Sequence, residues 1–310
     1  MQIIKAGRKN TILAQVWRKK MNYTLCNECL TVEISDEGAQ LLSIRGNGTE
    51  YLWQGDPAYW QERSPVLFPF VGRFTDGKYT YDGVEYEMTL HGFAKRMTFA
   101  AEAASDTQVT FTLSDTPETL KNYPRRFLFQ ISYTLKKTTL GVLYRVENRD
   151  EKMMHFGLGG HPGFNVPLEE GLSFEDYAIT FAHPCRPDRV LFSPAYQLDY
   201  ARPLYPLKDG TKIPLHHDLF DDDAIVLENM ADTISIRSDK GIRSVTVHIP
   251  QMPYVGFWHK IRTDAPYVCI EPWVTLPSRD GVVEEFADRY DLIRLAPGGV
   301  YENRWEITAE

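Results

Sequence analysis

The sequence predicts an all-β protein in which antiparallel strands form extensive packed sheets within one large domain. Apolar and polar residues alternate along strand-length runs such as residues 127–135 and 245–249, and a two-residue period is typical of strands with one buried face. Turn-forming residues separate these runs, and no helical period persists beyond about three turns. Few and short helices are therefore expected.

The first strand is expected to begin at Met21, after an N-terminal segment of different character. Residues 1–20 hold a basic cluster made up of Arg8, Lys9, Arg18, Lys19 and Lys20. This segment is either a real extension or the result of an upstream start, with Met21 as the functional beginning. Because termini are the loosest part of most domains, we expect residues 1–20 to be dispensable and residues 21–310 to form a single domain.

Turn signals indicate where later elements begin and end. Asp82 and Gly83 lie between two strand-like runs, residues 78–81 and 84–87, and such a pair is typical of a two-residue hairpin turn. Further loops are expected at residues 46–48, 209–210 and 239–241. Short helices are expected within residues 118–123 and 283–290.

The composition of the chain limits which classes of binding partner and which cellular compartment are expected. The chain has 310 residues, of which 43% are hydrophobic, so it can bury a large core. Its net charge of −8 argues against nucleic acid or an anionic membrane as the main partner, since both favour a basic patch. We find no apolar run of transmembrane length and no secretory signal. A cytoplasmic monomer or homodimer is expected.

Four cysteines do not make a disulfide scaffold in a chain of this length. Cys26 and Cys29 have the C-x-x-C spacing, so a redox pair or half of a zinc site has to be considered. No second C-x-x-C exists, and the pair lies in a strand-like run, residues 23–34. We therefore expect reduced cysteines and no metal site.

Two histidines lie among backbone-permissive residues. His161 is preceded by two glycines and followed by Pro162 and Gly163, a density that favours close approach of the backbone to a ligand. The alternative is a tight turn in which His161 takes no part. His91 lies between Leu90 and Gly92, and taken alone it is better explained as a loop histidine bonded to backbone.

Glu271 follows the apolar run 267–270, which should be a buried strand. In an extended strand it shares a face with Cys269 and Trp273. A buried carboxylate is costly unless it is paired or used, and burial raises its pKa toward the working range of a general base. A structural salt bridge to Arg73 or Arg279 is the alternative.

Polar and aromatic residues near these positions could contact a ligand. Arg73 follows an apolar stretch and Gly72, where its planar guanidinium could hold hydroxyl groups or only cap a surface strand. The acidic triplet at residues 221–223 precedes an apolar strand, and one member could accept hydrogen bonds from vicinal hydroxyls. The indoles that could support a sugar ring are Trp53, Trp60, Trp258 and Trp273.

Four motifs in this order resemble the aldose 1-epimerase (galactose mutarotase) family, most closely its LacX-like branch. They are residues 64–73, 91–94, 160–165 and 269–273, and the resemblance runs from about Met21 to the C-terminus. It implies a large antiparallel β-supersandwich of the mutarotase type with a cofactor-free active site on one sheet, acting on a small-molecule sugar.

The resemblance also implies a role for each matching residue. Glu271 would be the base, His161 the acid, and His91 would hydrogen-bond near the sugar ring oxygen. For the substrate, Arg73 would hold hydroxyls and Asp222 would match the sugar-binding aspartate, with Asp223 as the adjacent alternative. Trp273 is included as a binding residue. No metal and no cofactor are expected.

Two departures from the classical galactose enzymes leave the substrate open. Those enzymes carry an Asn-His pair before the first His-Gly motif and another at the second histidine, whereas this chain has residues 89–91 and 159–161 without asparagine. The predicted activity is interconversion of the α and β anomers of a hexose. The alternatives are a non-catalytic carbohydrate-binding protein and a hexose-phosphate 1-epimerase, the latter suggested by Arg63, Lys95 and Arg96.

Two other enzyme classes fit less well. A glycosidase needs a pair of carboxylates across the scissile bond, which Glu271 and the acidic triplet could supply, but it would leave the histidines unexplained. A metal-dependent cupin would prefer a close His-x-His pair, which the sequence lacks.

Overall fold

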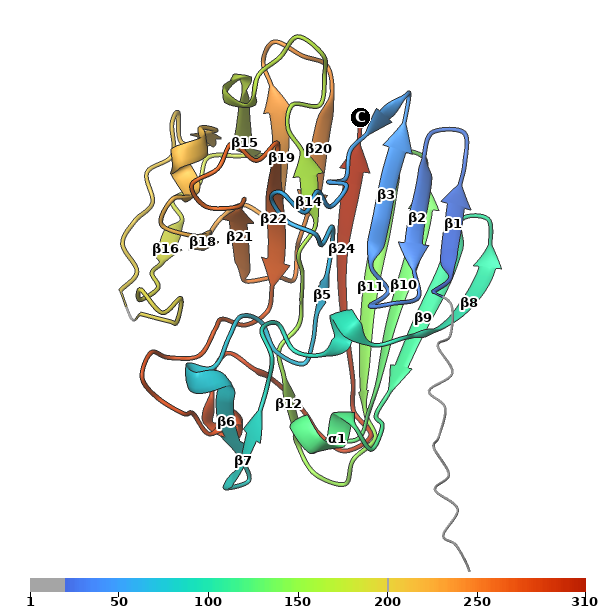
Figure 1. Cartoon of the computed structure of the whole chain (residues 1–310), viewed down its shortest axis with the longest axis vertical. Helices are drawn as coiled ribbons and strands as arrows, with labels where there is room; N and C mark the ends of the chain where they lie inside the picture. The colour runs from blue at the N-terminus through green and yellow to red at the C-terminus, as the bar shows by residue number, and fades with distance from the viewer. Residues whose placement is uncertain (1–19, 200) are drawn as a thin grey trace, which may run out of the picture.

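A computed structural model describes residues 20–199 and 201–310 of the chain. Figure 1 shows a β-rich molecule in which the sheets lie against one another in layers. The predicted N-terminal extension, up to residue 19, lies outside the described residues. Among the described residues no helix is both long and apolar enough to cross a membrane.

A nine-stranded antiparallel sheet forms one layer. In spatial order it consists of β17 (Lys212–Pro214), β15 (Tyr177–Phe181), β19 (Thr233–Ser238), β20 (Ser244–His248), β24 (Val300–Ala309), β11 (Thr139–Asn148), β10 (Phe127–Lys136), β9 (Gln108–Ser114) and β8 (Ala100–Ser105). Its centre is built from the long strands β10, β11 and β24, which pair over nearly their whole length.

Two further sheets cover different parts of this layer (Figure 1). The seven-stranded sheet, which carries the candidate site, contains β16 (Asp188–Val190), β18 (Ile225–Glu228), β21 (Tyr254–Trp258), β22 (Tyr267–Trp273), β13 (Gly159–Gly160) and β5 (Val66–Leu67), with β14 (Gly163–Asn165) also paired to β22. The four-stranded sheet contains β1 (Asn22–Cys26), β2 (Thr31–Ser35), β3 (Leu41–Gly46) and β4 (Thr49–Glu50).

The remaining elements are short. Two pairs of strands stand apart, β6 (Lys78–Tyr81) with β7 (Val84–Glu87) and β12 (Met154–Phe156) with β23 (Ile293–Leu295). The helical elements are α1 (Thr119–Asn122) and the 3-10 turns η1 (Thr75–Gly77), η2 (Ala94–Arg96), η3 (Phe174–Asp176), η4 (His217–Phe220) and η5 (Phe286–Asp288).

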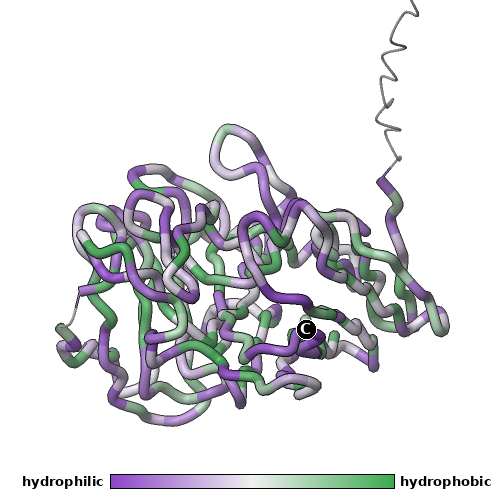
Figure 2. The backbone as a smooth tube through the Cα atoms, turned by 90° about the horizontal axis from the view of Figure 1, so that it is seen from below, coloured by the Kyte–Doolittle hydropathy of each residue, from purple (hydrophilic) through white to green (hydrophobic). Residues whose placement is uncertain are grey.

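The main hydrophobic core lies between the layers. The rings of Tyr23 on β1 and Phe111 on β9 meet edge to face at 5.4 Å, and those of Phe181 on β15 and Phe257 on β21 approach to 6.2 Å. Figure 2 shows hydrophobic and hydrophilic residues alternating along much of the chain. This alternation lets each strand place one face in the core while the opposite face remains available for other contacts.

The structure confirms the predicted all-β antiparallel architecture. The alternating apolar residues of β10 are buried from Phe127 to Leu135. Asp82 and Gly83 form the turn between β6 and β7, both with positive φ (54° and 73°), as a two-residue hairpin of this hand requires. The two predicted helices shorten to α1 and η5.

The prediction that residues 23–34, which include the C-x-x-C pair, form one continuous strand-like run was wrong. The chain turns between β1 and β2, with Cys26 at the end of β1 and Cys29 in the turn. The carboxamide oxygen of Asn27 accepts hydrogen bonds from the backbone N–H groups of Cys29 and Leu30. A local side-chain cap of this kind gives the backbone an alternative to strand pairing. All four cysteines are free.

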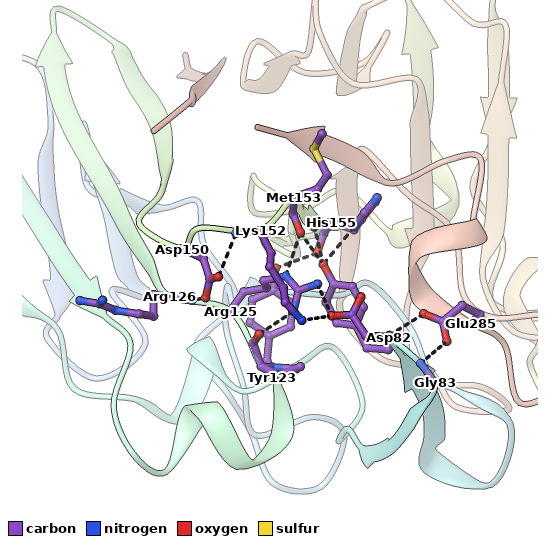
Figure 3. Close-up of polar contacts among 12 residues, drawn as sticks. Asp82, Gly83, Tyr123, Arg125, Arg126, Asp150, Lys152, Met153, His155 and Glu285 are labelled. Atoms are coloured by element: carbon purple, nitrogen blue, oxygen red, sulfur yellow. Dashed lines mark hydrogen bonds and ion pairs between the residues drawn. The ribbon is translucent and has the colours of Figure 1, made fainter. Parts of the chain in front are cut away.

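A buried arginine anchors the β6–β7 hairpin to the chain that leaves the large sheet (Figure 3). The guanidinium of Arg125 lies 3.9 Å from the centroid of the Tyr81 ring. It donates hydrogen bonds to the Met153 carbonyl at 2.8 Å and to the Asp82 carboxylate at 3.0 Å. The Asp82 carboxylate also accepts from Lys152 at 2.9 Å, so one turn residue joins two cations.

We expect Arg125→Met to destabilise the protein by about 2 kcal/mol, because it removes a buried cation–π contact together with charged hydrogen bonds. Thermal unfolding followed by circular dichroism would show the change. The neighbouring Arg126 is exposed, and Arg126→Met should change stability by no more than about 0.5 kcal/mol. Equal shifts for the two variants would contradict the anchoring role.

Candidate functional site

Strand β22 carries Glu271 on the face turned away from the nine-stranded sheet. Val268 and Ile270 belong to the main core, so the alternate residues project from the opposite side of the strand. Glu271 lies there with only 2% of its surface exposed. The salt bridges to arginine considered from the sequence are replaced by a histidine contact, and Arg279 pairs with Glu284 instead.

His161 lies between two short strands that both pair with β22. Gly159 in β13 pairs with Trp273, and Gly163 in β14 pairs with Cys269. A Cβ atom on Gly159 would come within 2.9 Å of the Pro272 carbonyl oxygen, so this glycine permits the close backbone approach predicted from the sequence. As a result, His161 Nε2 lies 3.1 Å from Glu271 Oε2.

Aromatic rings enclose the His161 imidazole. The ring centroids of Trp60 and Trp258 lie 4.9 Å and 5.7 Å away, and that of His91 lies 5.5 Å away at nearly a right angle. His161 is 8% exposed. Both His161 Nδ1 and Glu271 Oε2 are buried polar atoms without an aligned hydrogen-bond partner among the described residues, so each is free to bond to a ligand.

His91 occupies a turn with positive φ (66°), an uncommon conformation for a residue with a side chain. Two reciprocal hydrogen bonds hold it there. The His91 backbone N–H donates to the Gly72 carbonyl at 2.8 Å, and the Gly72 N–H donates to His91 Nδ1 at 3.0 Å. Because Nδ1 accepts a hydrogen bond, the neutral imidazole carries its proton on Nε2.

A cavity of about 330 Å³ brings most of the predicted residues together. Its volume lies within the range of small-molecule sites. Glu271, His161, His91, Arg73 and Trp273 all line it. Arg73 is exposed at the cavity, and its guanidinium lies 5.1 Å from the Tyr196 ring centroid. The three remote motifs and the arginine therefore share one pocket.

Of the acidic triplet, Asp223 lines the cavity. Asp222 was the sugar-binding aspartate implied by the resemblance, and Asp223 was its alternative. Asp222 is not among the lining residues, whereas Asp223 lines the cavity and is partly buried. Asp223 has a positive φ (84°). Burial raises the pKa of the Asp223 carboxyl above its usual value, while Arg73 opposes the rise.

Burial also controls protonation at the centre of the site. It raises the pKa of Glu271 well above its ordinary value, and the Asp223 charge adds to the rise. It lowers the pKa of His161 to about 3, with a further contribution from the Lys95 charge. The pKa of His91 falls well below its usual value for the same reason, and His161 adds to the fall. Burial thus favours the neutral pair of Glu271 carboxyl and His161 imidazole.

Lys95 and Glu62 form a charged pair on the cavity wall. Lys95 was named from the sequence only in support of the hexose-phosphate alternative, and Glu62 was not named. The Lys95 ammonium lies 3.1 Å from a Glu62 carboxylate oxygen, and the lysine side chain is only 5% exposed. Lys95 follows directly on the His91 turn, in η2. The closeness of Lys95 to His91 in the sequence indicated this lysine, whereas no sequence pattern indicated Glu62.

Other residues considered from the sequence lie differently. Trp60 and Trp258 line the cavity with Trp273. Trp53 lies outside the cavity lining and donates from its indole to the Trp60 carbonyl at 2.8 Å. Arg63 donates to the Leu42 carbonyl and is not among the lining residues, so it supports the chain rather than the site. Arg96 is exposed and outside the lining.

The chain is similar to known proteins over nearly its whole length. The profile of the family "Aldose 1-epimerase" matches residues 21–308. The plasmid-encoded protein LacX of Lactococcus lactis subsp. lactis is 31% identical over 300 residues, which cover 93% of this chain and 99% of that protein.

Solved structures show the same architecture. The galactose mutarotase related enzyme of Lactobacillus acidophilus superposes with a TM-score of 0.89 at 35% identity, covering 94% of this chain and 97% of that chain. A galactose mutarotase-like protein of Lactobacillus casei has a TM-score of 0.87 at 30% identity, covering 94% and 100%. Together these similarities show that the chain belongs to the aldose 1-epimerase family, and this membership supports a general epimerase or mutarotase role.

Proposed function

We propose that this protein is an aldose 1-epimerase that interconverts the α and β anomers of a hexose by acid–base ring opening. The observation that carries the proposal is the convergence of Glu271 and His161, which are remote in the chain and meet at 3.1 Å on the wall of a cavity of sugar size. A carboxyl and an imidazole in contact can exchange a proton and can act on two oxygens of one substrate.

The reaction needs only proton transfers. Glu271 removes the proton from the anomeric O1 hydroxyl, and His161 protonates the ring oxygen. The bond between C1 and the ring oxygen breaks, which leaves an open-chain aldehyde. Rotation about the C1–C2 bond presents the other face of the aldehyde, and closure runs both transfers backward. His91, with its proton on Nε2, donates a hydrogen bond near the ring oxygen.

The buried pair must redistribute its proton before the reaction. Burial favours the proton on Glu271, whereas the proposed roles require it on His161. A sugar hydroxyl that donates to the Glu271 carboxylate favours the ionised form, and so does an imidazolium 3.1 Å away. Substrate binding therefore moves the proton within the pair, and the pair carries one proton in either form.

This arrangement predicts an unusual dependence of the rate on pH. The pair gains a second proton only near the lowered His161 pKa of about 3, and it loses its single proton only above the raised pKa of Glu271. Between these limits kcat/KM should not change with pH. Initial rates, corrected for spontaneous mutarotation, would test this. An inflection near the ordinary histidine pKa of about 6.5 would contradict it.

A matched pair of variants tests the acidic triplet. We expect Asp223→Asn to weaken sugar binding roughly tenfold to hundredfold, because a charged acceptor for sugar hydroxyls is lost. Asp222→Asn is the control, since Asp222 lies outside the cavity lining. Isothermal titration calorimetry with the preferred hexose gives both affinities. A larger loss in the Asp222 variant would reverse the assignment.

Polarimetry on freshly dissolved α-anomers tests the proposed reaction. The full-length protein should accelerate the approach to anomeric equilibrium in proportion to its concentration. Binding without acceleration would instead support a non-catalytic carbohydrate-binding protein. The sugars tested should include hexose 6-phosphates, because the cationic side chains of Arg73, Lys95 and Lys260 line the cavity. A strong preference for the phosphorylated sugars would favour the hexose-phosphate reaction.

A further inference from the structure

A third potential metal ligand lies behind the acid–base pair. Cys269 precedes Glu271 by two positions on β22 and so projects from the same face of the strand. A ring nitrogen of His161, the Cys269 sulfur and a Glu271 carboxylate oxygen all lie within 4.8 Å of one another. We infer that these three residues form an inhibitory site for a thiophilic divalent cation of the zinc class.

The donor set fits this class of ion. Imidazole nitrogen, thiolate sulfur and carboxylate oxygen are the ligands that Zn²⁺ takes in proteins, and three protein ligands leave a fourth position open. All three residues are buried, and His161 Nδ1 and Glu271 Oε2 lack aligned partners among the described residues. Shifts of about 1 Å would bring the ligand atoms to the spacing of a tetrahedral site.

Binding of the ion must displace protons. Burial raises the pKa of the Cys269 thiol well above its usual value, so the free site holds a neutral thiol. A coordinated thiol is deprotonated. The ion therefore releases the thiol proton and the carboxyl proton of Glu271, and its affinity rises with pH. His161 binds as the neutral imidazole, which burial already favours.

Inhibition by the ion rests on the proposed function, because the ion would bind both members of the acid–base pair. With Glu271 and His161 coordinated, neither can exchange a proton with a sugar. The cation and the sugar are thus mutually exclusive at this cavity. Cys269 itself lies outside the cavity lining and takes no part in the ring opening, so its replacement separates metal binding from mutarotation.

Cobalt(II) spectroscopy tests the site without measuring activity. The chain has four cysteines, and the C-x-x-C pair could itself bind cobalt. The probe protein is therefore the full chain with Cys26→Ser, Cys29→Ser and Cys185→Ser, which leaves Cys269 as the only thiol. We expect one equivalent of Co²⁺ to produce a thiolate-to-cobalt charge-transfer band in the near ultraviolet. Absence of that band in the folded protein would overturn the inference.

Inhibition by Zn²⁺ supplies the second measurement. Zinc should suppress mutarotation by the wild-type protein, and a chelator should restore it. In Cys269→Ala the zinc concentration for half-inhibition should rise at least about tenfold. The activity of this variant without metal should be retained. Cys185→Ala should behave as wild type. Unchanged inhibition in Cys269→Ala would refute the site. If the cobalt band forms but no sugar is turned over, the metal site stands and the proposed function fails.

Discussion

Replacing Glu271 with glutamine should reduce kcat for mutarotation by roughly 10²–10⁴-fold, the usual contribution of one general acid–base catalyst. The glutamine side chain has nearly the shape of the native one but could not accept the O1 proton. Glu271 is 2% exposed and lies beside His161, so an uncharged isostere should fit without disturbing β22. The affinity for sugar should change little, and polarimetry with calorimetry would separate kcat from binding.

Glu62→Gln is a suitable control for this variant. Glu62 also presents a carboxylate to the cavity, but that carboxylate pairs with Lys95 and has no proposed role in proton transfer. We expect a much smaller loss of kcat there. Near-normal turnover by the Glu271→Gln protein would remove this residue from the mechanism.

Replacing His161 with asparagine should give a loss of similar size, roughly 10²–10⁴-fold. The imidazole is the group that protonates the ring oxygen, and asparagine cannot donate a proton to the leaving oxygen. The substitution also removes the contacts of the His161 imidazole with Trp60 and Trp258. Thermal unfolding should therefore accompany the kinetic measurement as a check of folding.

The double variant Glu271→Gln, His161→Asn distinguishes a pair that acts as a unit from two independent catalysts. Residues that act together lose nearly all of their effect when one is removed. We therefore expect the double variant to be about as slow as the slower single variant. Multiplicative losses would show that the two residues act separately.

The architecture was accessible from the sequence because strand periodicity and turn chemistry are local properties. The alternation in β10 and the Asp82–Gly83 turn appear where they were predicted. The reversal between Cys26 and Cys29 was missed, since it depends on a cap by the Asn27 side chain within an otherwise strand-like run. Such competition between a side chain and strand pairing has no periodic signature.

The sequence motifs that form the site could be predicted. Which individual side chains within them reach the cavity could be predicted less well. Which member of the acidic triplet reaches the cavity depends on the positive φ of Asp223, and a loop residue with that conformation cannot be located by counting. Burial of Lys95 beside the exposed Arg96 depends on one turn of 3-10 helix.

The sequence analysis expected burial to raise the pKa of Glu271 but did not expect burial to lower the pKa of His161. The roles implied by the family resemblance, Glu271 as the base and His161 as the acid, require a free carboxylate and a protonated imidazole in the reacting state. Burial depth, which the sequence does not specify, shifts the pKa values of His161 and Glu271 in opposite directions and favours the neutral pair.

The central claim is that a single sugar ring spans Glu271 and His161, and a crystal structure with bound hexose tests it most directly. The account predicts the anomeric hydroxyl within hydrogen-bond reach of the Glu271 carboxylate, the ring oxygen beside His161, and Asp223 in contact with other hydroxyls. A hexose bound elsewhere, or bound in this cavity with its anomeric carbon turned away from both residues, would contradict it.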